Sequence, residues 1–107
     1  MKKSRTSKLQ VYLLEEAQLD VWETKSYYDA VLPGLGKRFL LDFKYTVQKI
    51  KANPFSFGYR HEQFRTANFK IFPYQIHYLI QEEDFKIILF AVLHSFRNPN
   101  YIKNRNK

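Results

Sequence analysis

The chain has 107 residues, no cysteine, 18% aromatic residues and a formal net charge of +8. This length supports one domain with a single core, and the lack of cysteine excludes disulfides and thiolate metal sites, which suits a reducing cytoplasm. No apolar run approaches the length of a membrane span, and no h-region follows the basic residues at the N-terminus. We therefore expect one soluble, cytoplasmic domain over residues 1–107.

The positive charge is concentrated at the two ends of the chain. Residues 1–8 and residues 97–107 contain eight of the 18 Lys and Arg residues and no acid. The body between them therefore has ten basic residues against all ten Asp and Glu residues, and it is neutral. Basic tails of this kind attract nucleic acid or acidic protein surfaces, or they simply keep a domain soluble.

The first half of the chain is predicted to form a strand and two helices. Residues 9–14 alternate between apolar and polar positions, as a strand does. A helix is expected to follow, because Glu15 and Glu16 suit a helix N-terminus and Pro33-Gly34 ends the periodic segment. Its apolar stripe consists of Ala17, Val21, Thr24, Tyr28 and Val31.

Leu19 and Trp22 lie off that stripe but are adjacent on the surface of a helix. Such a pair either widens the core face or marks a patch that binds a partner.

A second helix is predicted from about residue 36 to residue 52, where Asn53-Pro54 ends it. The short link at residues 33–36 predicts that the two helices form an antiparallel hairpin. The apolar stripe of the second helix consists of Phe39, Leu40, Phe43, Val47 and Ile50.

The second half of the chain is predicted to form strands. Residues 62–72 are expected to be one strand, which Pro73 separates from an alternating strand over residues 74–80. An acidic turn at residues 81–84 leads to the nearly continuous apolar run 85–93, predicted to be the central strand with both faces covered. The order strand-helix-helix-strand-strand-strand predicts an α+β fold, with the helical hairpin on one face of a mostly antiparallel sheet.

Two motifs give the chain a resemblance to a known family. FPYQIHY at residues 72–78, followed by AVLHSFRNP at residues 91–99, resembles the RelE/ParE toxins of bacterial type II toxin–antitoxin modules. Pro33-Gly34-Leu35-Gly36 and Asn53-Pro54 fit the same pattern, and the resemblance covers about residues 9–105. It implies the fold predicted above, a cognate antitoxin protein as partner and no cofactor.

The resemblance leaves two activities open. RelE-like members cleave messenger RNA on the ribosome, whereas ParE-like members inhibit DNA gyrase. At four positions where the nuclease branch has basic residues, this chain has Thr66, Asn68, Gln75 and Ser95. Lys70 and Tyr101 alone match expected basic or aromatic positions. The resemblance therefore favours a ParE-like toxin of the plasmid-stabilisation type that inhibits gyrase by binding; the alternative is a ribosome-dependent mRNA endoribonuclease.

Each of the two activities would depend on a different set of residues. A nuclease would use Lys70, His77, His94, Arg97 and Tyr101. His77 and His94 suit general acid–base catalysis, although His94 is also suited to a structural hydrogen bond that closes the end of the sheet. A gyrase-directed toxin would bind its target through Arg97, Tyr101, Lys103 and Arg105.

The remaining predictions concern partners and metals. Leu19 and Trp22 are the candidates for antitoxin binding, by an acidic, amphipathic antitoxin segment that lies along the helical hairpin or a sheet edge. No metal site is expected from His61, His77 and His94, because their spacing matches no ligand motif. A nucleic-acid-binding module without toxicity is a third alternative, but Tyr74, Tyr78 and Phe90 are predicted to be core residues rather than stacking platforms.

Overall fold

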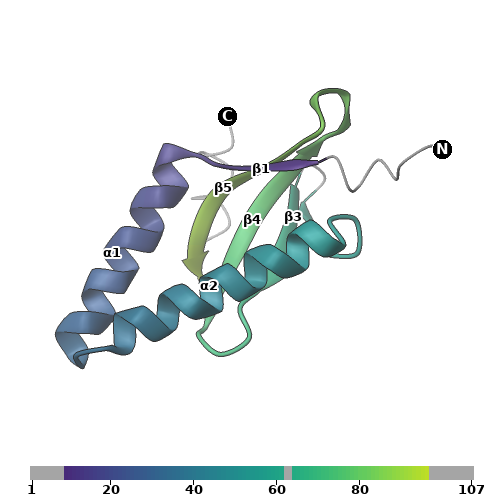
Figure 1. Cartoon of the computed structure of the whole chain (residues 1–107). Helices are drawn as coiled ribbons and strands as arrows, with labels where there is room; N and C mark the ends of the chain where they lie inside the picture. The colour runs from purple at the N-terminus through teal and green to yellow at the C-terminus, as the bar shows by residue number, and fades with distance from the viewer. Residues whose placement is uncertain (1–8, 62–63, 97–107) are drawn as a thin grey trace.

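The structure is a computed structural model that describes residues 9–61 and 64–96, without the side chains of 59–61. In chain order the elements are β1 (Gln10–Leu13), α1 (Glu15–Val31), α2 (Leu35–Ala52), β2 (Tyr59–His61), β3 (Phe64–Asn68), β4 (Tyr74–Gln81), the 3₁₀ turn η2 (Glu82–Asp84) and β5 (Lys86–His94). The predicted α+β class is confirmed, with both helices on one side of a sheet (Figure 1). Neither of these two helices has the length and apolarity that a membrane crossing requires.

The strands form one mixed sheet in the order β1-β5-β4-β3-β2. β1 pairs with β5 in parallel, and the other neighbours are antiparallel. The apolar run predicted to be the central strand is β5, which lies between β1 and β4, while β4 takes the middle place in the five-strand order. The first and last of these strands in the chain are thus hydrogen-bonded neighbours, so the helical hairpin that follows β1 must fold back over the sheet.

The strand predicted over residues 62–72 is wrong in its extent, because β3 spans Phe64–Asn68 and a turn follows; residues 62–63 lie outside the described residues. The predicted order also lacks β2, a further strand over Tyr59–His61. The buried carboxylate of Asp42 on α2 accepts three backbone hydrogen bonds from this turn. The donors are the N–H groups of Lys70 at 3.0 Å, Ile71 at 2.8 Å and Phe72 at 2.8 Å. These amides point at α2 instead of at a neighbouring strand, which ends β3 early.

The main core lies between the helical hairpin and the sheet. Phe39, Ile50 and Val21 are buried there as predicted, whereas Phe43 is half-buried against the same cluster. Val47, Tyr28 and Leu40 are half-buried in the same way. Val31 is exposed, contrary to the predicted stripe, because the C-terminal end of α1 extends past the sheet (Figure 1). The four alternating residues of β4 that the sequence places on one face, Tyr74, Ile76, Tyr78 and Ile80, all belong to this core.

The hydroxyl of Tyr78 anchors the loop that follows α2. It donates a hydrogen bond of 2.7 Å to the carbonyl oxygen of Pro54. The ring is fully buried, and burial raises the pKa of Tyr78 to about 12. Tyr78 therefore stays a neutral donor at physiological pH, and the end of α2 is fixed to the middle strand.

The turn between the helices is closed by Asp29. Its Oδ1 accepts the N–H of Gly36 at 2.7 Å, and its Oδ2 lies 2.7 Å from the Nζ of Lys25. The hydrogen bond from Lys25, and then that from Gly36, lower the pKa of the Asp29 carboxyl. Gly34 has a φ of 91°, a left-handed conformation that glycine adopts without steric cost. One carboxylate thus joins the end of α1 to the first turn of α2.

We expect Asp42→Ala to destabilise the protein strongly. The substitution leaves three amides of the β3–β4 turn without their acceptor, and hydrogen bonds to a buried charge are among the strong ones. The free energy of unfolding should fall by about 3 kcal/mol or more. Urea denaturation measures this change, with the exposed Asp84→Ala as the control expected to stay within about 0.5 kcal/mol of wild type. If the urea midpoint of Asp42→Ala equals that of wild type, the carboxylate does not stabilise the β3–β4 turn.

Gly36→Ala is expected to lower stability even though alanine is the better helix former. A Cβ at this position would lie 2.5 Å from the carbonyl oxygen of Lys25 and 2.6 Å from the Cγ of Asp29. The steric cost of about 1–3 kcal/mol exceeds the roughly 1 kcal/mol gained in helix propensity. Gly58→Ala is the matched control, since a methyl group there would meet nothing within 4 Å. A Gly36→Ala protein as stable as Gly58→Ala would show that the helices approach less closely here.

Candidate functional site

An exposed apolar patch lies at the junction of β1 and α1. The side chains of Leu19 and Trp22 are 51% and 62% exposed. Together with Leu13 and Val21 they line a hollow of about 410 Å³, and the polar residues Glu15 and Gln18 line it as well. Exposed aromatic and aliphatic side chains around a hollow are typical of protein-binding sites.

The way in which α1 docks on the sheet determines the exposure of this pair. Ala17 and Val21 are buried against the sheet, and the Oδ2 of Asp20 accepts the N–H of Val92 on β5 at 2.9 Å. β1 ends at Leu13, which pairs with Leu89. Val92 lies beyond that end, and Asp20 supplies the hydrogen-bond acceptor for its N–H group. These contacts fix the rotation of α1, and Leu19 and Trp22 consequently point away from the core.

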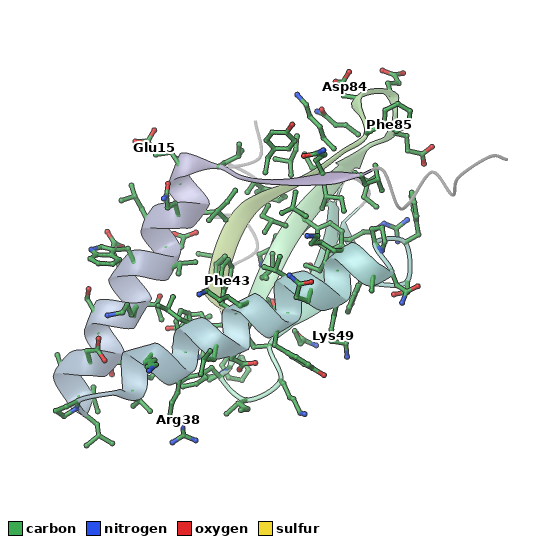
Figure 2. The ribbon with its side chains drawn as sticks, viewed as in Figure 1. Glu15, Arg38, Phe43, Lys49, Asp84 and Phe85 are labelled. Carbon is green, nitrogen blue, oxygen red and sulfur yellow. The ribbon has the colours of Figure 1, made fainter. Side chains whose placement is uncertain are left out.

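The two helices carry opposite charge. α1 contains five acidic residues and one lysine, while α2 contains five basic residues and one acid, Asp42. Figure 2 shows the side chains of Arg38 and Lys49 projecting outward from α2, and that of Glu15 at the start of α1. Near the hollow, the ammonium of Lys25 lies 5.6 Å from the ring centroid of Trp22. The Leu19 and Trp22 hollow therefore belongs to the acidic helix, and the basic surface of the hairpin lies on α2.

The candidate nuclease residue Lys70 lies on the helix side of the sheet. It is exposed in the turn after β3, and its ammonium lies 5.3 Å from the ring centroid of Tyr45 on α2. His77 lies on the other face, fully buried, with its Nδ1 2.9 Å from the Oγ1 of Thr66. Its ring contacts Phe64 and Phe90, so the sheet lies between His77 and Lys70.

His94 points to the face opposite that of His77. It pairs with Tyr74 across β4 and β5, with their ring centroids 5.2 Å apart, and Tyr74 belongs to the core under the helices. The Nδ1 of His94 accepts the N–H of Phe96 at 3.2 Å, a hydrogen bond at the end of the last strand. The structure therefore does not bring His77 and His94 together.

The other predicted site residues fall outside the described part of the chain. Arg97, Tyr101, Lys103 and Arg105 lie beyond residue 96, and the side chain of His61 is likewise outside the description. Among the side chains of residues 9–58 and 64–96, no group of three or more His, Asp or Glu residues could hold a metal ion.

β5 contains a bulge that the sequence analysis did not predict, and it affects the face of the sheet opposite the helices. His77 pairs with Ala91 and the next residue, Tyr78, pairs with Leu89, so Phe90 is an extra residue on β5. The bulge places Phe90 beside Phe64, with ring centroids 5.3 Å apart, and both rings are buried. The prediction that Phe90 is a core residue is confirmed, but the strand alternation alone gives no signal for the bulge.

The comparisons with known proteins support the same fold. No family model matches the chain, and no curated protein matches it significantly. Among solved structures, a chain of the structure described as "Chromosomal ParDE TA system from P. aeruginosa" matches with a TM-score of 0.72. The match covers 82% of this chain and 97% of that chain, at 13% sequence identity. The match shows that this chain shares its fold with a chain of that structure, and it agrees with the fold that the sequence resemblance implies.

Proposed function

We propose that this chain is the toxin of a bacterial type II toxin–antitoxin module, and that a cognate antitoxin neutralises it by binding. The observation that carries the proposal is the RelE/ParE-like fold. A chain of a toxin–antitoxin structure shares this fold, and the match covers 97% of that chain and 82% of this one. The exposed hollow at Leu19 and Trp22 adds a surface of the kind that a protein partner covers. A segment of the antitoxin would place an apolar side chain there.

DNA gyrase is the target that we propose, and inhibition by binding is the mode of action. RNA cleavage needs a base, an acid and cations within reach of one phosphate. Lys70 lies beside α2, His77 is buried on the opposite face of the sheet, and His94 holds the end of β5. This separation supports a binding toxin over a nuclease. Under this proposal the C-terminal residues Arg97, Tyr101, Lys103 and Arg105 contact the target.

The second candidate is the ribosome-dependent endoribonuclease. The observation in its favour is Lys70, an exposed cation at a position where the nuclease branch expects a basic group. Tyr101 would complete that site from the C-terminal segment.

Trp22→Ser should weaken the complex with the antitoxin while the chain stays folded. The partner in the assay is the cognate antitoxin that we propose, to be sought among small acidic proteins encoded next to this gene. Loss of a central tryptophan typically costs about 2 kcal/mol or more, roughly 30-fold in Kd. Calorimetry measures the affinity, and Tyr27→Ser is the matched control, since Tyr27 on the same helix is 61% exposed against 62% for Trp22. Equal affinity for both variants would place the contact elsewhere on the toxin.

The two activities can be separated on one purified sample. For a gyrase-directed toxin, the chain should inhibit DNA supercoiling, and removal of residues 101–107 should reduce that inhibition without unfolding the body. For a nuclease, messenger RNA bound to ribosomes should be cut, and Lys70→Ala or Tyr101→Ala should slow cleavage by about 100-fold or more. Cleavage that either substitution abolishes, with supercoiling unaffected, would replace the gyrase proposal by the ribonuclease one.

A further inference from the structure

The backbone leaves the sheet at a turn that immediately follows β5. His94 is the last residue of β5 and pairs with Tyr74, and the N–H of Ser95 still donates to the carbonyl oxygen of Pro73 at 2.9 Å. The next N–H, that of Phe96, donates to the Nδ1 of His94 at 3.2 Å. The imidazole of His94 is therefore the acceptor for the last described N–H group before residue 97.

Burial contributes little to this turn. The side chain of Phe96 is 88% exposed, which is the highest exposure among the large apolar side chains of the described residues. Among the described rings it contacts that of His94, with the centroids 5.5 Å apart. The position of Phe96 thus depends on His94, through a hydrogen bond and a ring contact.

The hydrogen bond has the connectivity of an Asx turn. In such a turn, the Oδ1 of Asn or Asp accepts the N–H of the second residue that follows it. The Nδ1 of histidine is bonded to Cγ, as the Oδ1 of asparagine is, so the two acceptors occupy equivalent positions. A histidine differs in one respect, because its Nδ1 can bind a proton and then no longer accepts.

Protonation of the imidazole removes this hydrogen bond. An Nδ1 that accepts an N–H carries no proton, so His94 is neutral in this structure, with its proton on Nε2. In an imidazolium both ring nitrogens are donors, and two N–H groups would face each other. Histidine is the side chain that ordinarily changes charge between about pH 5 and pH 8. The bond is therefore expected above this range and lost as the pH falls through it.

The described surroundings of His94 do not compensate a positive charge. The neighbouring titratable groups are Tyr74 on β4, with its ring centroid 5.2 Å away, and behind it Tyr28 on α1. Both are phenols, a group that carries no charge at neutral pH. The ion pairs of the described residues do not include His94. Residues 97–107 contain four basic residues and no acid, so an imidazolium adds a further cation beside a basic segment.

We propose that His94 is a positioning residue, whose neutral imidazole fixes the turn from which residues 97–107 continue and whose protonation releases that turn. This segment contains Arg97, Tyr101, Lys103 and Arg105, to which the proposed function assigns target binding, and the effect on the target rests on that function. A fixed start to the segment lowers the entropy cost of placing its side chains on a target. Target binding is therefore strongest while His94 is neutral and weakens in mildly acidic solution.

Two substitutions separate the hydrogen bond from the ring contact. His94→Asn retains an acceptor at the equivalent position but cannot titrate, whereas His94→Phe retains a ring but has no acceptor. NMR on the intact chain measures the amide hydrogen exchange of Phe96 between about pH 5 and pH 8, relative to an unstructured peptide. In wild type this protection should fall about fivefold as the imidazole ¹⁵N signals show protonation. His94→Asn should keep its protection over the whole range, and His94→Phe should lack it throughout.

The core provides the control for unfolding. The amide signals of Ile76 and Val92, two buried residues in the middle of β4 and β5, should stay native in all three proteins over the same range. Loss of protection at Phe96 alone then reports on the turn rather than on the whole domain.

Inhibition of gyrase supercoiling tests the consequence for the target. The three proteins are compared at about pH 8 and at about pH 6, and the ratio of wild type to His94→Asn cancels the pH dependence of gyrase itself. Between the two pH values wild type should lose about fivefold in potency relative to His94→Asn. His94→Phe should be weaker than wild type at the higher pH by a similar factor.

The outcomes distinguish failure of this proposal from failure of the proposed function. Protection of Phe96 that ignores the titration of the imidazole, or that persists in His94→Phe, would show that His94 does not hold the turn. Equal pH dependence of inhibition in wild type and His94→Asn would show that the turn does not govern target binding. A wild-type chain without effect on gyrase would refute the proposed target and the effect on it, while the NMR result would still decide the role of His94 at the turn.

Discussion

The carboxylate of Asp42 is the interaction on which the arrangement of helices and strands depends. It is buried, and its two oxygens accept the N–H groups of three consecutive residues in the turn between β3 and β4. A carboxylate removed from water needs such donors, and the turn needs an acceptor for amides that point away from the sheet. The contact fixes how far α2 is rotated about its axis. That rotation decides that Phe39 and Ile50 face the sheet and that Leu41 and Tyr45 face outward.

Two further aspartates act in the same way at other junctions. Asp20 joins α1 to the backbone of β5, and Asp29 joins the end of α1 to the start of α2. Each carboxylate links two elements by accepting a backbone N–H group, so the link does not depend on which side chain the donor residue has. On α2 the one acid, Asp42, is buried in such a link, and this has an electrostatic consequence. The helix lacks an exposed acid, and its outer face is basic along its full length.

Both faces of the sheet hold buried side chains, and the candidate binding surfaces lie on the helices. One face of the sheet is covered by the helices, and on the other Phe64, Phe90 and His77 are buried. The histidines that could serve in catalysis are divided between the two faces. Several large exposed apolar groups lie on the helices, at Leu19 and Trp22 on the acidic helix and at Leu41 on the basic one, while others such as Ile71 and Phe96 lie in turns. A protein built in this way is suited to bind other macromolecules along its helical hairpin.

Periodicity in the sequence predicted both helices and the strands β1, β3, β4 and β5, because the 3.6-residue and two-residue repeats are local. Pro33-Gly34 and Asn53-Pro54 predicted where the helices end, and β2 was not predicted. Periodicity also identified Leu19 and Trp22 as lying off the buried stripe, and the two motifs of the second half indicated the resemblance from which the fold was expected. Only the tertiary structure decided where β3 ends, where β5 bulges and which face each histidine takes. Asp42 and its donors are 28 to 30 residues apart, and strand register depends on similarly distant partners. Contacts over such separations leave no periodic trace in the sequence, since each depends on two segments that the chain brings together only when it folds.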